Sequence, residues 1–172
     1  MESKENTGLM GSLESYEDIL IRGVDRDDFV ELESIDTGVF GTLAYPTFVL
    51  RQFMDVHGES LLVAASAGGL CGYSLGAATI DHGEGWLLAL AVRDEFRGRG
   101  YGRALTTETL KVLRRHRVRT ACLTVAPGNV AALGLYRSLG FTPLREVEDY
   151  LGTGEDRVIM SCDLVAGEQQ RA

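Results

Sequence analysis

Cysteine is scarce in this sequence: there are only three, Cys71, Cys122 and Cys162, with no Cys-x-x-Cys pair and no Cys/His spacing. An odd number of cysteines without such spacing argues against a disulfide framework and against a zinc site. All three stand in apolar, strand-like stretches of the chain. We therefore expect each of them to be a buried packing residue, and we predict no metal.

Long apolar runs and an excess of positive charge are missing as well. No run approaches the ~20 apolar residues that cross a bilayer, and the N-terminus lacks the basic-then-apolar order of a signal peptide. The net charge of -8 gives little electrostatic support to nucleic-acid binding. We expect a cytoplasmic protein with no nucleic-acid or membrane partner. The acidic field suits a cationic substrate such as an amine, although acidity also serves solubility.

Only three prolines occur, and no linker interrupts residues 16–165. A length of 172 residues with 45% hydrophobic content suits one domain with a sizeable core. Residues 1–15 and 166–172 are polar and show no hydrophobic period. We expect residues 1–15 to form a mobile leader, residues 16–165 the domain, and residues 166–172 a frayed tail.

The hydrophobic pattern predicts a single α/β domain. A glycine turn at residues 67–69 predicts a hairpin, and a helix that returns the chain between two apolar strands predicts a parallel pair. A loop with Gly38 and Gly41 is expected between the first two helices. Helices are predicted over residues 28–35, 47–56, from 103 onward and 130–139. Strands are predicted over residues 19–21, 60–66, 70–80, 86–92, 119–125, 141–150 and 157–164.

The most informative stretch is the glycine-rich turn Arg97–Gly102, which follows an apolar strand ending in Ala91 and Val92 and precedes a helix expected from Arg103. Backbone amides at a helix start have no intrahelical partner, and glycines let an anion approach them closely. The turn is therefore typical of a phosphate site, although glycines here also serve packing alone. It is neither a dinucleotide fingerprint, which needs glycine at position 103, nor a P-loop.

Two motifs carry a resemblance to a known family. Arg97, Gly100 and Gly102 form Arg-x-x-Gly-x-Gly, which resembles the pyrophosphate-binding turn of the GNAT superfamily of N-acetyltransferases. The stretch from Asn129 to Phe141 resembles the Asn-x-x-Ala-x-x-Leu-Tyr-x-x-x-Gly-Phe signature that follows it. Two motifs in the right order are more specific than one. The resemblance implies the GNAT fold, a mixed, mostly antiparallel sheet splayed at a central parallel strand pair and flanked by about four helices.

The resemblance further implies acetyl-CoA as co-substrate, lying in the gap between strands 86–92 and 119–125. Backbone groups of Leu90, Ala91 and Val92 would hold the pantetheine arm, with the thioester carbonyl near Leu90. Asn129 would bind that arm, cap its own helix, or do both. The pyrophosphate is expected to bind the backbone amides and the arginine side chains of the turn, which consists of Arg97, Gly98, Arg99, Gly100, Tyr101, Gly102 and Arg103. The alternative for each arginine is a solvated surface residue.

For chemistry, the resemblance points to Tyr136 as the general acid that protonates the leaving thiolate, with a core aromatic as the alternative. The base is not identified. Thr124 stands where related enzymes often carry an acid, and a threonine cannot serve. Other ionisable residues near strand ends are Glu84, His82, Glu148 and Asp149, each of which is equally explained as an exposed charge.

The C-terminal part, from Arg145 to Met160, is similar to the ribosomal-protein N-terminal (alanine) acetyltransferase family, where a tyrosine pair contacts the peptide. This chain has Tyr150 followed by Leu151. Tyr45, Thr124 and Tyr150 are the expected acceptor-binding residues, with packing on the second helix as the alternative for Tyr45.

The leading hypothesis is therefore direct acetyl transfer to a primary amine in a ternary complex. A protein N-terminus, a lysine and a small amine remain open as acceptors. The alternative is an acetyl-CoA-binding regulatory module without catalysis. Dimers are common in the family, so a homodimer is a further expectation.

Overall fold

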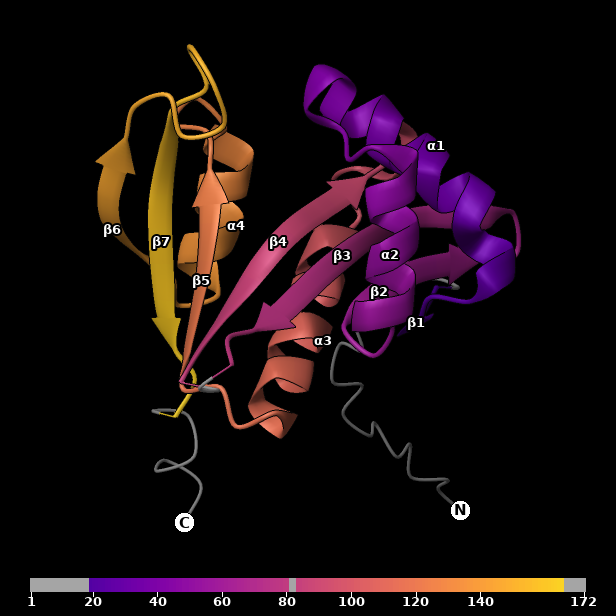
Figure 1. Ribbon diagram of the computed structural model, residues 1–172, viewed down its shortest axis with the longest axis horizontal. Helices are drawn as coiled ribbons and strands as arrows, with labels where there is room; N and C mark the ends of the chain where they lie inside the picture. Colours follow the sequence, from indigo (N-terminus) through magenta and orange to yellow (C-terminus); the bar gives the residue numbers. More distant parts are fainter. Residues whose placement is uncertain (1–18, 81–82, 166–172) are drawn as a thin grey trace, which may run out of the picture.

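The computed structural model describes residues 19–80 and 83–165, so the predictions for residues 1–15, 166–172 and His82 lie outside the described part. The strands form one seven-stranded sheet in the order β1-β2-β3-β4-β5-β7-β6 (Figure 1). All neighbours are antiparallel except β4 and β5, which are parallel as predicted. The strands are β1 Leu20–Gly23, β2 Leu61–Ser66, β3 Gly69–Ala78, β4 Glu84–Val92, β5 Thr120–Val125, β6 Thr142–Val147 and β7 Arg157–Asp163.

In the described part of the chain, four α-helices cover the two faces of this sheet: α1 and α2 lie on one face, and α3 and α4 on the other (Figure 1). The first pair packs through Leu32, Ile35 and Leu50 on β2, β3 and β4, while Leu110 and Tyr136 belong to the opposite core. The helices are α1 Phe29–Phe40, α2 Thr47–His57, α3 Tyr101–Arg115 and α4 Val130–Ser138, with single 3-10 turns η1 Arg26–Asp28, η2 Gly41–Leu43 and η3 Asp94–Phe96.

Helix α1 is longer than predicted, because it continues to Phe40 through Gly38. A single glycine weakens a helix by only about 1 kcal/mol, which packing of Leu32 and Ile35 in the core outweighs. The α-helix ends at Phe40, because the C-cap Gly41 has a φ of 57°, which lies outside the right-handed α-helical region. The prediction that both glycines lie in a loop was therefore wrong for Gly38. Strand β6 is shorter than predicted and ends at Val147.

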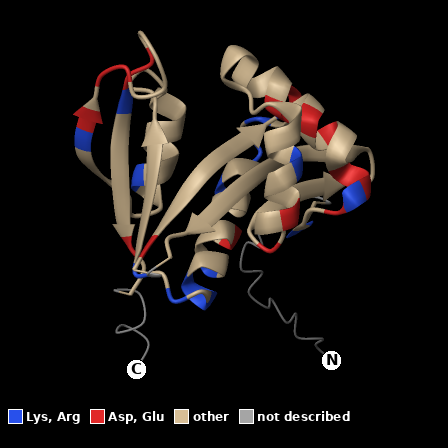
Figure 2. Ribbon diagram, viewed as in Figure 1, with Lys and Arg blue, Asp and Glu red and all other residues tan. Residues whose placement is uncertain are grey.

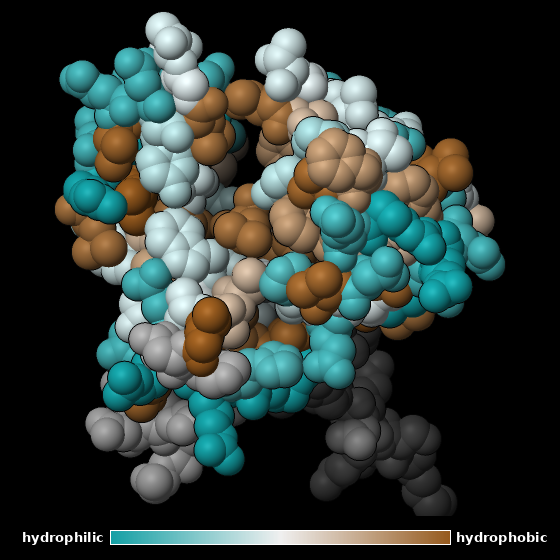
Figure 3. Space-filling view, viewed as in Figure 1, coloured by the Kyte–Doolittle hydropathy of each residue, from teal (hydrophilic) through white to brown (hydrophobic). Residues whose placement is uncertain are grey.

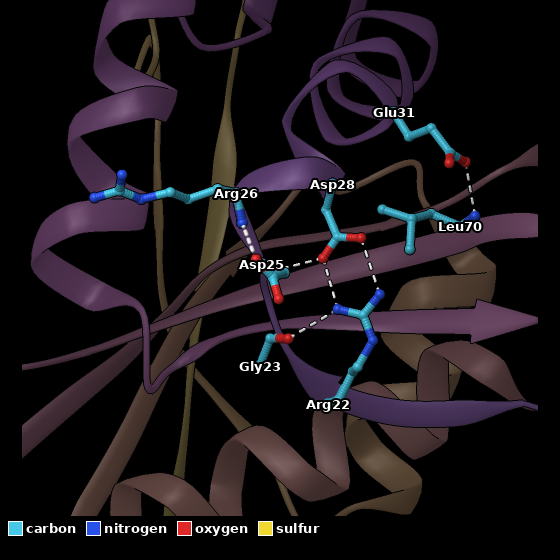
Figure 4. A network of polar contacts seen from close by, with 7 residues as sticks. All are labelled: Arg22, Gly23, Asp25, Arg26, Asp28, Glu31 and Leu70. Atoms are coloured by element: carbon cyan, nitrogen blue, oxygen red, sulfur yellow. Dashed lines mark hydrogen bonds and ion pairs between the residues drawn. The ribbon is translucent and has the colours of Figure 1, made fainter.

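A polar network fixes the start of α1 against the sheet (Figure 4). Asp25 caps η1, and the carboxylate of Asp28 accepts hydrogen bonds from the Asp25 amide and from Arg22 of β1, at 2.7 and 2.6 Å. The Arg22 guanidinium lowers the pKa of that carboxyl. One turn later, Glu31 accepts from the Leu70 amide of β3 at 2.8 Å. These bonds hold α1, and with it the loop after the helix, in place over the sheet.

The cysteine prediction is confirmed, since Cys71, Cys122 and Cys162 are all buried and free. Within residues 19–80 and 83–165, every helix is too short or too polar to span a bilayer.

Candidate functional site

The two parallel strands separate halfway along their length. Their pairing runs only from Glu84 opposite Thr120 to Leu87 opposite Leu123, although β4 continues to Val92 (Figure 1). On its other edge, β4 carries a bulge at Leu88, because the register with β3 passes from Leu87 directly to Ala89. A bulge strengthens the local bend and twist of its strand, and this one stands where the strands part. The predicted splay is confirmed.

The open side of β4 presents unpaired backbone. The Arg93 amide donates to the Cys71 carbonyl at 2.9 Å, so the alternating pattern of an antiparallel pair directs the Ala91 groups toward β3. The amides and carbonyls of Leu90 and Val92 then face the gap. Consistent with this, the Val92 carbonyl is free to accept from Nε of Arg97 at 3.3 Å. Of the three predicted backbone contacts, Leu90 and Val92 face the gap, while Ala91 is buried against β3.

A cavity of about 350 Å³ occupies the splay and draws on both faces of the sheet. Its lining comes from four segments: residues 40–45 at the end of α1 and just after it, residues 87–90 of β4, residues 124–136 at the end of β5 and in α4, and the β6–β7 connection with Arg157. Figure 3 shows the corresponding hollow between the side that carries α1 and α2 and the side that carries β6 and β7.

Tyr136 lines this cavity from α4 and is only 6% exposed. Its ring packs edge-on against Phe141 with centroids 5.8 Å apart, so the predicted core role is present. No described residue hydrogen-bonds its hydroxyl, yet among the described residues every fully buried polar side-chain atom has a partner. The hydroxyl therefore reaches accessible space, which here is the cavity. Burial raises the pKa of Tyr136 to about 12, so the hydroxyl is protonated at neutral pH.

Asn129 lines the same cavity at the N-terminus of α4. Its side-chain oxygen accepts from the Ala132 amide at 3.1 Å, which is the capping role. The side-chain NH₂ is not used by that cap. Both predicted roles of Asn129 are therefore geometrically compatible.

The glycine-rich turn forms the N-terminus of α3, which begins two residues earlier than predicted. Gly98 and Gly100 have φ angles of 76° and 83°, in the left-handed region, and Gly100 is the N-cap without a side-chain hydrogen bond. The amides of Tyr101, Gly102 and Arg103 in the first turn have no intrahelical acceptor. Space next to Gly102 is bounded by Leu90 and Leu135 at ordinary contact distance, which places the turn beside β4 and α4.

The arginines of the turn lie on its exposed rim. Arg97 forms a 2.8 Å ion pair with the exposed Asp94, and the Arg99 guanidinium lies 5.5 Å from the Phe96 ring centroid. Arg103 donates to the Ser138 hydroxyl of α4 at 2.6 Å. The side chain of Tyr101 is buried under the turn and packs beside Phe96. All three arginines are thus exposed at the N-terminal end of α3.

Two of the three predicted acceptor-binding residues line the cavity, and the third does not. Tyr45 and Thr124 line the cavity, but at the β6–β7 connection Leu151 lines it and Tyr150 does not. Tyr45 packs edge-on against Phe53 of α2 at 5.1 Å, as the packing alternative predicted, and its hydroxyl makes a long 3.5 Å hydrogen bond to the Leu88 carbonyl. Sequence reasoning missed five further lining residues on this side: Phe40, Leu43, Leu88, Leu151 and Arg157.

Of the ionisable residues considered as a base, none of the three that the structure describes lines the cavity. Glu84 lies at the opposite end of β4, where it accepts from Nε1 of Trp86 at 2.6 Å. Glu148 and Asp149 are outside the cavity in the β6–β7 connection, and Asp149 accepts a hydrogen bond there from the Gly154 amide. The described residues that line the cavity include no aspartate, glutamate or histidine.

Asp36 is a buried carboxyl that the sequence did not reveal. It lies on α1, is 1% exposed, and accepts from the Tyr45 amide at 2.7 Å and from the Tyr73 hydroxyl. Burial raises the pKa of Asp36 by more than the two hydrogen bonds lower it, so the pKa lies above its ordinary value. Asp36 thereby fixes the backbone of Tyr45 at the mouth of the cavity. A single aspartate within a helix gives no signal of this role.

Comparison with known proteins gives a consistent result. The family described as acetyltransferase (GNAT) matches residues 26–141. An uncharacterized N-acetyltransferase of Methanocaldococcus jannaschii, MJ1530, is 32% identical over 147 residues, which are 83% of this chain and 90% of that protein. An N-alpha-acetyltransferase of Sulfolobus acidocaldarius is 25% identical over 131 residues, which are 70% of this chain and 78% of its own length.

Among solved structures, the ribosomal-protein-S18-alanine N-acetyltransferase of Escherichia coli superimposes with a TM-score of 0.70 at 24% identity. The match covers 85% of this chain and 94% of that one. This similarity supports the fold, with its splayed sheet and flanking helices.

Proposed function

The chain belongs to the acetyltransferase (GNAT) family, and from that premise we propose that it acetylates the α-amino group at the N-terminus of a peptide or protein. The enzyme is an acetyl-CoA-dependent N-acetyltransferase, so the non-catalytic alternative is set aside. The observation that carries the choice of acceptor is the lining of the cavity, which is largely apolar and has no carboxylate among its described residues.

The residues around the splay fit acetyl-CoA. The amides and carbonyls of Leu90 and Val92 can hold an amide-rich arm as a substitute strand. The free amides of the first turn of α3, with the positive end of the helix dipole and three arginines near them, can hold the pyrophosphate. When bound, acetyl-CoA supplies a thioester that a neutral amine attacks directly. Tyr136 holds its proton until that step and donates it to the departing sulfur.

The described residues that line the cavity include no carboxylate, and this favours an α-amino group over a lysine side chain as the acceptor. Only the neutral amine has a lone pair for attack, and a desolvating cavity without an anionic partner lowers the pKa of the amine that enters it. An α-amino group starts from a pKa of about 7.7–8.0, whereas a lysine starts from about 10.4. The α-amino group is thus roughly 300-fold richer in its neutral form at neutral pH. A site without a strong base therefore suits an N-terminus.

Two further observations support the proposal. The similar protein from Sulfolobus acidocaldarius is named an N-alpha-acetyltransferase. In addition, acidic side chains gather on α1 and near the β6–β7 connection (Figure 2). Their negative field attracts a positively charged N-terminus to the mouth, and the lining then favours its neutral form.

A pair of peptides tests the proposal. One has a free N-terminus and no lysine; the other has the same sequence with an acetylated N-terminus and one internal lysine. At pH 7.5 we expect kcat/KM for the free N-terminus to exceed that for lysine by about 100-fold or more, from the difference in amine pKa. Thiol release measures the rate, and mass spectrometry locates the acetyl group.

The same experiment contains the contrary outcomes. Equal acetylation of the lysine peptide at pH 7.5 would contradict the α-amino proposal, because it would require a base that the described lining lacks. Thiol release with a panel of small amines, but with neither peptide, would show a small-molecule acceptor instead.

Substitution of Cys122 distinguishes direct attack by the amine from a covalent route through an acetylated cysteine. Cys122 pairs with Trp86 in the closed part of the sheet, and burial raises the pKa of its thiol to about 11, with a smaller contribution from Glu84. The thiolate nucleophile is therefore almost absent at neutral pH. We expect Cys122→Ala to keep kcat within about twofold. After incubation with acetyl-CoA alone, the intact mass of the wild type should show no acetyl group on Cys122. Loss of turnover in Cys122→Ala would support the covalent route.

A further inference from the structure

The acceptor side of the cavity is built from apolar side chains of three separate segments. Phe40 ends α1 and Leu43 lies in η2, Leu88 is the bulge residue of β4, and Leu151 comes from the β6–β7 connection. None of these segments is adjacent in sequence, so the chain folds to bring four large apolar residues to one mouth. Their role in binding rests on the proposed peptide acceptor and concerns the first side chain of that peptide.

These residues leave apolar surface uncovered. Leu43, Leu88 and Leu151 are 38%, 42% and 48% exposed, although each lines the same cavity. Apolar side chains exposed singly are common on protein surfaces, but several around one concave site mark a place where an apolar group binds. Figure 3 shows brown apolar residues on both sides of the hollow. The occupant of this end of the cavity therefore has an apolar surface of its own.

The charges at the acceptor end of the cavity disfavour an acidic or a cationic side chain on the first residue of the peptide. Arg157 is the one charged side chain in the described lining, and it is itself buried. It donates to a carboxylate oxygen of Glu155 at 3.0 Å and to the Asp156 carbonyl at 2.7 Å. Its charge is thus already compensated, which leaves little attraction for an acidic side chain. A cationic side chain would meet the arginine and no unpaired carboxylate in this lining.

We propose that the acceptor peptide begins with a large apolar residue such as leucine or methionine, and that Leu151 sets this preference. Leu151 stands in the connection between two strands, so its side chain can be changed without altering a helix or strand. Its isobutyl group lines the cavity from the β6–β7 side, while Phe40 and Leu43 line it from the α1 side. A first side chain of alanine or serine leaves the apolar surface of these residues in contact with water.

The test uses four peptides that differ only in the first residue: leucine, alanine, aspartate or lysine. We expect kcat/KM for the leucine peptide to exceed that for the alanine peptide by about tenfold or more, as for one or more methylene groups in an apolar pocket. Leu151→Ala should reduce this ratio by about fivefold or more while leaving the KM for acetyl-CoA unchanged. Leu144→Ala is the matched control, because Leu144 is 61% exposed on β6 and outside the cavity lining.

Each outcome decides one question. Acetylation of none of the four peptides would refute the proposed peptide acceptor itself. Acetylation of all four with kcat/KM values within about threefold would keep that acceptor but overturn the apolar preference. A leucine-to-alanine ratio that Leu151→Ala leaves intact would overturn the role of Leu151. A ratio reduced equally in Leu144→Ala would overturn it too, because the change would then belong to the β6–β7 region in general. A thermal unfolding midpoint shows that each variant is folded.

Discussion

Tyr136→Phe is expected to lower kcat by about 10²-fold or more, the usual contribution of a positioned general acid, while acetyl-CoA still binds. The substitution removes one oxygen and keeps the ring, which packs against Phe141 and belongs to the core on the α4 side of the sheet. The hydroxyl has no partner among the described residues. Its loss therefore leaves no orphaned hydrogen-bonding group there, and stability should change little.

The pH dependence gives an independent readout of the same residue. Burial raises the pKa of Tyr136 to about 12, so the hydroxyl carries its proton below that pH and loses it only above. In the wild type, kcat should therefore show no fall with rising pH between about 7 and 10 that originates in this group. Any rise in that range reflects deprotonation of the acceptor amine.

The controls separate chemistry from binding. The dissociation constant for acetyl-CoA, measured by calorimetry, should match between Tyr136→Phe and the wild type, because the backbone of β4 and the α3 turn are untouched. A KM for the acceptor that also stays constant would place the whole effect on turnover. If kcat is unchanged, Tyr136 is a core aromatic only, and proton donation must come from water.

Much of the fold could be predicted because its signals are local. Apolar runs with glycine turns predicted the β2–β3 hairpin, and the helix α3 between two apolar strands predicted the parallel pair of β4 and β5. The donor side was equally local, since the glycine-rich turn and Asn129 carry their chemistry in contiguous stretches. Helix α1 was predicted too short, because packing of its apolar face keeps Gly38 helical.

The acceptor side could not be predicted in the same way. Phe40, Leu88, Leu151 and Arg157 meet only after their segments fold together, and each of them alone looks like an ordinary core or surface residue. The role of Asp36 could not be predicted either, because it depends on hydrogen bonds from the Tyr45 amide nine residues later and from the Tyr73 hydroxyl in β3. Periodicity locates elements, but it does not say which side chains from different elements share a cavity.

The donor side depends on backbone conformation, which glycine substitutions test most directly. Gly100 is the N-cap of α3 with a φ of 83°, a conformation that costs a residue with a side chain roughly 1–2 kcal/mol. Gly100→Val should therefore displace the amides of the first turn and raise the dissociation constant for acetyl-CoA by about tenfold or more, which corresponds to about 1.4 kcal/mol. Calorimetry with acetyl-CoA measures this change.

Gly140→Val is the matched control, because Gly140 has a φ of 92° and follows the end of α4, where an added Cβ would meet only the Cys162 sulfur within 4 Å, at ordinary contact distance. Both variants carry similar strain, so both should lower the unfolding midpoint, but only Gly100→Val should weaken coenzyme binding. Gly98→Ala provides a milder case, since φ there is 76° and nothing described lies within 4 Å of the added Cβ. Equal dissociation constants for the Gly100 and Gly140 variants would contradict a pyrophosphate site on the α3 turn. The open edge at Leu90 and Val92 would then have to supply most of the affinity.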